Sequence, residues 1–275
     1  MILFPHAKIN IGLDIIGRLP NGFHTLETLM VHTDWEDVLE LTPAADTELV
    51  CTGLHIDCPP EKNLAMKAFR LMEAETGGLP PTRLQLHKNV PDGAGLGAGS
   101  ADAAYTLLGL NELYNLGFPR EKLAEMAAQL GSDCPFFIYD CPMLCSGTGT
   151  VLTPAPDLAG VLEKYCVVIV RPPFGVSTKE AYSGVRPYEG SRPALIERVK
   201  VPVGQWQDSV GNDFEPSVIK SHPEIAEIKR IFRSLGAEYV QMSGSGSAVF
   251  GLFPDEVDSD ILSELLSGCF IHVGK

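Results

Sequence analysis

The segment that most constrains this chain is a glycine-rich loop between a strand and a helix. Residues Asp92 to Gly99 read DGAGLGAG and follow the alternating segment Arg83 to Val90. The apolar-faced sequence after them predicts a helix with Ser100 as its N-cap. Glycines let backbone N–H groups approach phosphate oxygens closely, and a helix N-terminus adds about half a positive charge. The layout predicts an anion-binding site, with a merely flexible loop as the alternative.

Two known nucleotide-binding loops fit this segment poorly. No Gly-Lys-Ser/Thr follows the glycines, so the loop is not a Walker A motif. Gly93, Gly95 and Ala98 match only the looser Rossmann pattern, and the acidic residue expected about 20 positions later is missing. Alanine tolerates only negative φ well, so we expect no positive φ at Ala94 and Ala98.

Strand and helix patterns alternate in both halves of the chain. Strands are predicted over 4–13, 83–90, 165–170, 237–242, 248–253 and 269–273, and helices over 63–75, 100–117, 120–130, 223–235 and 257–266. The Pro- and Gly-rich stretch 147–160 is the best linker candidate. These patterns indicate a two-part α/β or α+β protein.

Composition excludes several classes of function. Lys plus Arg is 21 against 35 for Asp plus Glu, so the net charge is −14, which disfavours nucleic acid and anionic lipid as partners. Apolar runs such as Cys166 to Val170 are far shorter than the roughly 20 residues of a bilayer-spanning helix. The first residues lack a signal-peptide pattern. The 7 cysteines never occur as C-x-x-C, which favours a reducing compartment. We expect a soluble cytoplasmic protein.

A few polar residues are candidates for chemistry, each with a structural alternative. Lys8 and Asn10 lie on one side of the first strand, where they could simply face solvent. Asp133 precedes Pro135 and could act as an N-cap. His24, beside a predicted turn, could be a surface residue, and 243–247 (SGSGS) could be an ordinary hairpin turn. No zinc-ligand spacing or Gly-x-Ser-x-Gly elbow occurs, which argues against a protein-bound metal centre and a hydrolase.

Longer blocks carry a family resemblance over essentially the whole chain. PDGAGLGAGSADAA resembles the phosphate loop of the GHMP kinases. HAKINIGLDIIGRLPNGFHTLETLM, EKNLAMKAF, LGSDCPFF, RPPFGVST, GNDFEP and MSGSGSAVFG are similar, in order, to the kinases that act on 4-diphosphocytidyl-2-C-methyl-D-erythritol. The resemblance implies transfer of phosphate from ATP, with Mg²⁺, to the substrate's 2-hydroxyl in the non-mevalonate route to isopentenyl diphosphate. Ala101 and Asp102 depart from the usual Ser-Asn of this loop.

The resemblance also assigns residues. It implies Lys8 and Asp133 as the catalytic pair, with Asp133 as general base. ATP would be bound by Asn63, Lys88, Pro91, Asp92, Gly93, Ala94, Gly95, Leu96, Gly97, Ala98, Gly99, Ser100 and Ala101. The cytidyl substrate would be bound by Asn10, Phe23, His24, Tyr182, Ser243, Gly244, Ser245 and Gly246. Mg²⁺ would be held mainly by the ATP phosphates rather than by protein ligands.

The fold implied by the resemblance is α+β with two domains. Residues 1–154 would form a nucleotide-binding domain like the second domain of ribosomal protein S5, and 155–275 a ferredoxin-like domain, with the active site in the cleft between them. The alternatives are a GHMP kinase for another small alcohol, such as mevalonate or homoserine, a decarboxylating relative, or a non-catalytic ligand sensor. The Phe23-His24 pair argues for a substrate with a base. Monomer and homodimer both stay open.

Overall fold

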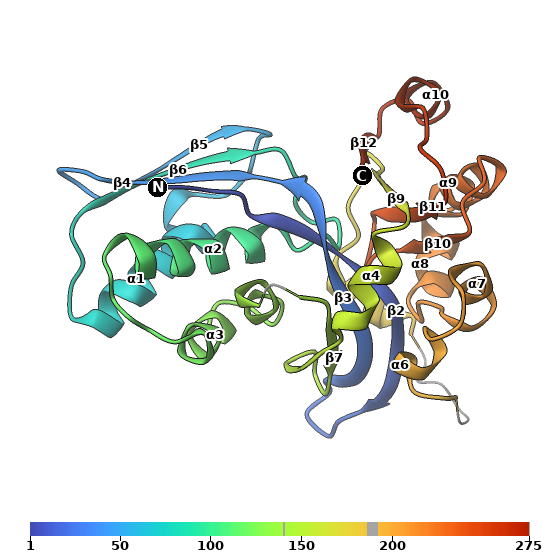
Figure 1. The fold of residues 1–275 in the computed structure, drawn as a ribbon, viewed down its shortest axis with the longest axis horizontal. Helices are drawn as coiled ribbons and strands as arrows, with labels where there is room; N and C mark the ends of the chain where they lie inside the picture. The colour runs from blue at the N-terminus through green and yellow to red at the C-terminus, as the bar shows by residue number, and fades with distance from the viewer. Residues whose placement is uncertain (140, 186–191, 275) are drawn as a thin grey trace. The chain divides into compact units, whose positions relative to one another are not determined.

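The computed structural model describes residues 1–139, 141–185 and 192–274. The chain forms two compact units that are discontinuous in sequence. Unit 1 comprises residues 1–7, 35–92 and 97–140, and unit 2 comprises 8–34, 93–96 and 141–275. The chain changes unit within the long strands β2 (His6–Arg18) and β3 (His24–Glu36), which Figure 1 shows in dark and light blue.

Unit 1 is a sheet with helices on one face. Its strand order is β1-β4-β6-β5, with β5 and β6 parallel and the other pairs antiparallel. The strands are β1 (Ile2–Leu3), β4 (Val38–Pro43), β5 (Glu48–Gly53) and β6 (Thr82–Lys88), and the helices are α1 (Leu64–Thr76), α2 (Ala98–Leu113) and α3 (Arg120–Ala128), with short 3-10 helices η1 (Pro60–Lys62) and η2 (Cys134–Ile138). Leu84 and Leu86 alternate with polar residues along β6 and are buried, as the period of a half-covered strand predicts. The helices α1, α2 and α3 lie along one face of the sheet (Figure 1).

A second sheet contains β2, β3, β7 (Met143–Ser146) and β8 (Val151–Pro154), in that order. The prediction of a linker over 147–160 is wrong, because β8 and two short helices begin within these residues. Gly147 and Gly149 have φ values of +65° and +90° and make the turn between β7 and β8, which pair as an antiparallel hairpin. The 3-10 helix η3 (Pro156–Leu158) and the helix α4 (Ala159–Leu162) follow directly. Glycine and proline here mark a tight turn and helix start, not an unstructured connection.

The C-terminal part of unit 2 has a ferredoxin-like topology. Its strands are β9 (Cys166–Arg171), β10 (Tyr239–Met242), β11 (Val249–Phe253) and β12 (Phe270–Val273), in the antiparallel order β10-β11-β9-β12. Helix α9 (Glu224–Ser234) precedes β10, and α10 (Ser259–Leu265) connects β11 to β12. Between β9 and α9 lie α5 (Thr178–Ser183), α6 (Leu195–Arg198), η4 (Val203–Gln205), α7 (Trp206–Ser209) and α8 (Glu215–Ser221). The β-α-β-β-α-β order confirms the fold class predicted for this part.

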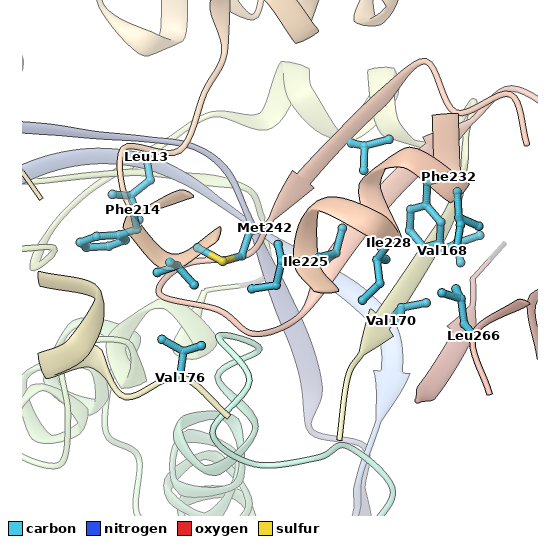
Figure 2. Packing of buried hydrophobic residues seen from close by; sticks show 14 of the residues in the cluster. Leu13, Val168, Val170, Val176, Phe214, Ile225, Ile228, Phe232, Met242 and Leu266 are labelled. Carbon is cyan, nitrogen blue, oxygen red and sulfur yellow. The ribbon is translucent and has the colours of Figure 1, made fainter. Parts of the chain in front are cut away.

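One apolar cluster joins these elements. Figure 2 shows Ile228 and Phe232 of α9 beside Val168 and Val170 of β9. Phe232 is fully buried, and at about 25 cal/mol per Å² such a side chain contributes roughly 2–3 kcal/mol on burial. A Cβ on Gly251 of β11 would lie 2.7 Å from the Phe232 ring, so the strand needs a glycine where this helix packs.

The predicted strands and helices are confirmed with end shifts of up to five residues; the strand predicted over 4–13, for example, continues to Arg18 as β2. The helix predicted over 100–117 is α2. That helix begins earlier than predicted, at Ala98, with Gly97 as its N-cap, so the assignment of Ser100 as N-cap is wrong. The left-handed conformation of Gly97 turns the chain into the helix before Ser100 is reached. No helix in the described ranges is both long and apolar enough to cross a membrane.

Candidate active site

The glycine-rich loop has the backbone that its sequence demands. Gly93, Gly95 and Gly97 have φ values of +65°, +76° and +70°, a region that L side chains rarely adopt. Ala94 and Ala98 are absent from the positive-φ residues among those described, as expected. Helix α2 starts without a side-chain cap, so its first N–H groups are not satisfied by such a cap. This geometry suits an anion.

Three hydrogen bonds fix the loop inside unit 2. The carbonyl oxygen of Leu96 accepts from Lys8 N at 2.9 Å, and that of Ala94 accepts from Ala248 N at 3.0 Å. The carbonyl oxygen of Gly95 accepts from the Ser243 hydroxyl at 2.9 Å. Strand β2 and the second glycine-rich loop (residues 243–247), together with Ala248 directly after it, therefore hold residues 93–96 from two directions.

Lys8 and Asn10 form a buried polar pair on β2, which decides against the solvent-facing alternative. Their exposed fractions are 3% and 2%. Lys8 Nζ donates to Asn10 Oδ1 at 2.5 Å. Asn10 Nδ2 donates to Thr28 Oγ1 at 3.1 Å, and Thr28 in turn donates to the carbonyl oxygen of Gly12 at 2.6 Å. This chain fixes which way the Asn10 amide faces, so that its oxygen meets the lysine.

The second glycine-rich loop lies against this pair. Gly244 has φ +56°, and a Cβ there would lie 3.0 Å from Asn10 Oδ1 and 3.6 Å from Lys8 Nζ. Asn212 Nδ2 donates to the carbonyl oxygens of Met242 and Gly244, at 2.8 Å each. Gly246 N closes the turn onto the Ser243 carbonyl at 2.9 Å, with Ser245 half-buried at its tip. The loop is thus more than a hairpin turn.

An aromatic group lies elsewhere in unit 2. The His24 and Tyr182 rings stack with centroids 5.0 Å apart and planes 22° apart. Tyr182 also meets Phe214 edge-on, at 4.7 Å. Phe23 is 65% exposed. The two predicted base-binding residues His24 and Tyr182 are therefore brought together, while Phe23 presents its ring to solvent.

Asp133 belongs to unit 1 and occupies the N-cap position of η2, where its side chain makes no capping hydrogen bond. It is half-buried, and its Oδ1 accepts from the Ser132 hydroxyl at 3.3 Å. The structural alternative of an N-cap is therefore not realised by this side chain. Burial raises the pKa of the adjacent Cys134 thiol to about 11, so the thiol is neutral near pH 7.

Asn63 and Lys88, expected near the nucleotide, also belong to unit 1. Asn63 is the N-cap of α1, where its Oδ1 accepts from Ala65 N at 2.9 Å. The Lys88 ammonium is 1% exposed and donates to Asp37 and to Asp102. A role of either residue in nucleotide binding stays a prediction, as do the other predicted ligand contacts.

Two residues of the Lys8 environment were missed by sequence reasoning. Thr28 and Asn212 are buried and make the bonds that orient Asn10 and the 243–247 loop. For Asn212, the sequence feature that could have pointed to the site is its position within the GNDFEP block, which carries part of the family resemblance. For metals, no group of three or more His, Cys, Asp or Glu side chains within 1–139, 141–185 and 192–274 could hold an ion.

Comparison with known proteins identifies the family. The GHMP kinases N terminal domain matches residues 63–141, and the GHMP kinases C terminal domain matches 192–269. The predicted boundary at 154 lies between these segments and stays a prediction. The chain is 46% identical over 260 residues to 4-diphosphocytidyl-2-C-methyl-D-erythritol kinase of Bacteroides fragilis, covering 93% of each chain. The kinase of that name from Parabacteroides distasonis is 41% identical, covering 100% of this chain and 99% of the relative.

Solved structures agree with these matches. A crystal structure of 4-(cytidine 5'-diphospho)-2C-methyl-D-erythritol kinase superposes with a TM-score of 0.83 at 31% identity, covering 100% of this chain and 98% of that one. The mevalonate kinase of Methanococcus jannaschii shares the fold, with a TM-score of 0.73 at 12% identity. The chain belongs to the 4-diphosphocytidyl-2-C-methyl-D-erythritol kinase family, within the GHMP kinases.

Proposed function

We propose that this chain transfers the γ-phosphoryl group of ATP to the 2-hydroxyl of 4-diphosphocytidyl-2-C-methyl-D-erythritol, with Asp133 as general base and Lys8 beside the acceptor. The observation that carries the proposal is the buried Lys8–Asn10 pair against two glycine-rich loops of unit 2. A buried ammonium next to backbone shaped for phosphate is suited to neutralise the charge of a transferring phosphoryl group.

The reaction divides into roles for named residues. Asp133 accepts the proton of the attacking hydroxyl, the hydroxyl oxygen bonds to the γ-phosphorus, and the bond to the β-phosphate oxygen breaks to release ADP. Lys8 orients the hydroxyl and offsets the negative charge that develops beside it. The backbone N–H groups of the 93–99 loop bind the phosphates. Mg²⁺, when bound with ATP, supplies charge neutralisation on the phosphate oxygens.

Recognition of the acceptor falls to other residues of unit 2. His24 and Tyr182 provide an aromatic surface and a ring nitrogen for a pyrimidine base, and stacking of this kind contributes about 0.5–1.5 kcal/mol beyond burial. The loop 243–246 is the candidate for binding the diphosphate. Mevalonate and homoserine carry no base and would leave the aromatic group unused.

The test is ADP release by purified protein with ATP and Mg²⁺ in parallel reactions with the cytidyl substrate, mevalonate and homoserine. We expect turnover with the cytidyl substrate alone, and its loss in Asp133→Asn. Turnover with another alcohol would contradict the substrate assignment. ATP binding without turnover on any of the three would favour a ligand sensor.

A further inference from the structure

Lys88, which the resemblance places near the nucleotide, lies at the centre of a buried charge cluster in unit 1 that has no part in the proposed transfer of the phosphoryl group. Its Nζ donates to Asp37 Oδ2, lies 2.8 Å from Asp102 Oδ2 and lies 3.7 Å from Asp92 Oδ1. The side chains of Asp37 and Asp102 are 0% and 3% exposed, whereas Asp92 is 44% exposed. One cation thus faces two fully buried carboxyl groups and one that reaches solvent.

The two buried carboxyl groups have unequal partners. Asp37 Oδ1 accepts from Asn89 N at 2.6 Å and from Val90 N at 2.9 Å, while its Oδ2 accepts from Lys88. Asp102 Oδ2 accepts from Lys88, and Asp102 Oδ1 is buried with no hydrogen-bond partner among the described residues. Hydrogen bonds from several N–H groups favour the ionised form of a carboxyl group, whereas burial of a carboxyl oxygen without a donor disfavours that form. If only one of the two is ionised, it is Asp37.

The charged groups around Asp102 agree with this assignment. Burial raises the pKa of Asp102 to about 8, with attraction to Lys88 opposing the effect and repulsion from Asp37 and Asp92 adding to it. Burial also opposes the charge on Lys88, but Asp102, Asp37 and Asp92 more than offset it, so the pKa of Lys88 is raised. From β5, the titratable neighbour is the Cys51 thiol, whose pKa is raised by burial.

The cluster connects the segments on both sides of the glycine-rich loop. Lys88 ends β6, Asn89 and Val90 lead into the loop, and Asp102 lies near the start of α2, which leaves it. Asp37 lies between β3 and β4 and holds the incoming segment through two backbone bonds. Lys88 therefore joins the loop's entry to its exit through hydrogen bonds to two carboxyl groups that are shielded from water.

We propose that Asp102 is held as a neutral carboxylic acid and that Asp37, Lys88 and Asp102 act as a positioning brace for the ATP loop, a brace that loosens when Asp102 loses its proton. This inference rests on the proposed function only for the identity of the loop's ligand. Ionised Asp102 would place a second buried negative charge on Lys88 and compete with Asp37 for it. The Asp37 bonds to Asn89 and Val90 then weaken, and the loop's entry becomes mobile.

The protonation state is measured directly by NMR on protein labelled with ¹³C at the aspartate carboxyl carbon. The Asp102 signal is assigned by its disappearance in Asp102→Asn. We expect it to titrate near pH 8, whereas titration below pH 5 would overturn the proposal. Exposed Asp46 in the same unit, replaced as Asp46→Asn, is the matched control, and its loss should leave the Asp102 titration unchanged.

The effect on the loop is measured by amide hydrogen exchange and by ATP affinity at pH 7 and pH 9. Between pH 7 and pH 9, we expect the exchange rates of the Asn89 and Val90 amides to rise more in the wild type than in Asp102→Asn. Over the same range, the Kd for Mg-ATP should increase about 10-fold in the wild type and stay constant in Asp102→Asn. The same loss of affinity in both proteins would overturn the brace. If the exchange difference is seen but ATP does not bind at any pH, the brace stands and the proposed function fails.

Discussion

The two glycine-rich loops of unit 2 meet at Gly95 and Ser243. The Ser243 hydroxyl donates to the Gly95 carbonyl oxygen at 2.9 Å, and a Cβ on Gly95 would lie 2.1 Å from the Ser243 carbonyl oxygen. Gly95 also has φ +76°. The contact explains why glycine is required at this position for two independent reasons, conformation and close approach of two backbones.

Gly95→Ala is therefore expected to cost more stability than Gly93→Ala. Gly93 has φ +65° but nothing within 4 Å of its added Cβ, so alanine there costs only the left-handed conformation, about 1–2 kcal/mol. At Gly95 the backbone of one loop must also move. Thermal unfolding of the two variants measures the difference, and equal losses would show that the Ser243 contact is unimportant.

A second prediction concerns the orientation of Asn10. Thr28→Val keeps the shape of the side chain but removes the hydroxyl that accepts from Asn10 and donates to Gly12. The amide then loses its fixed orientation toward Lys8, and we expect kcat to fall about 10-fold to 100-fold with the KM for ATP unchanged. Thr28→Ser retains the hydroxyl and should restore most of the rate. A kcat loss of the same size in both variants would separate Thr28 from the Lys8 environment.

Asp133→Asn tests the general base against a structural role. Because the Asp133 side chain makes no capping bond, the Tm of the variant should lie within about 2 °C of the wild-type Tm. Loss of a true cap would instead lower the free energy of unfolding by about 1 kcal/mol. Turnover should fall by about 10²–10⁴, and ATP binding should persist. A stable variant with wild-type turnover would remove Asp133 from the chemistry.

His24→Ala should weaken binding of the cytidyl substrate and leave ATP affinity unchanged. The reason is the stack of His24 on Tyr182, which we propose as the surface that binds the base of the acceptor. Tyr182→Phe, which keeps the ring, is the matched control and should bind the substrate nearly as well as the wild type. Calorimetry with each ligand separates the cases, and equal losses for both ligands would indicate misfolding instead.

Local pattern was sufficient to predict the elements and the glycine loop but not the contacts that orient the site. The alternation of Ala7, Ile9 and Ile11 predicts β2, and burial of these residues follows from it. The partner of Asn10, however, is Thr28, 18 residues away, and Asn212 reaches Gly244 across 32 residues. Such pairs depend on tertiary packing, which leaves no periodic signal in the sequence.

The same limit explains Lys88. The resemblance implies contact of Lys88 with the nucleotide, which stays a prediction; in the structure the ammonium is paired with Asp37, 51 residues away, and with Asp102 on the helix that follows. A lysine near a phosphate loop and a lysine within an internal ion cluster have the same local sequence. Only the burial of all three groups distinguishes an ammonium directed at protein carboxylates from one directed at solvent.

Asp102 should also give the folding stability a characteristic pH dependence. Its pKa is about 8 in the folded chain and near its ordinary 3.8 when unfolded. Below about pH 4 the proton is bound in both states, and the contribution to stability is fully present. As the pH rises toward 8, only the folded state retains the proton, so the free energy of unfolding falls, and above pH 8 it falls no further.

Asp102→Asn removes this slope, because an amide does not titrate. The Tm of Asp102→Asn minus that of the wild type should therefore increase from pH 5 to pH 8.5. At about 1.4 kcal/mol per pH unit between pH 5 and pH 8, the difference reaches about 4 kcal/mol, which would raise the Tm of the variant relative to the wild type by roughly 8–16 °C at the upper pH. Taking the difference between the two proteins cancels the titration of all shared groups, and Asp46→Asn should show none of the trend. A difference that is constant across the range would mean that Asp102 is already ionised in the folded protein at pH 5.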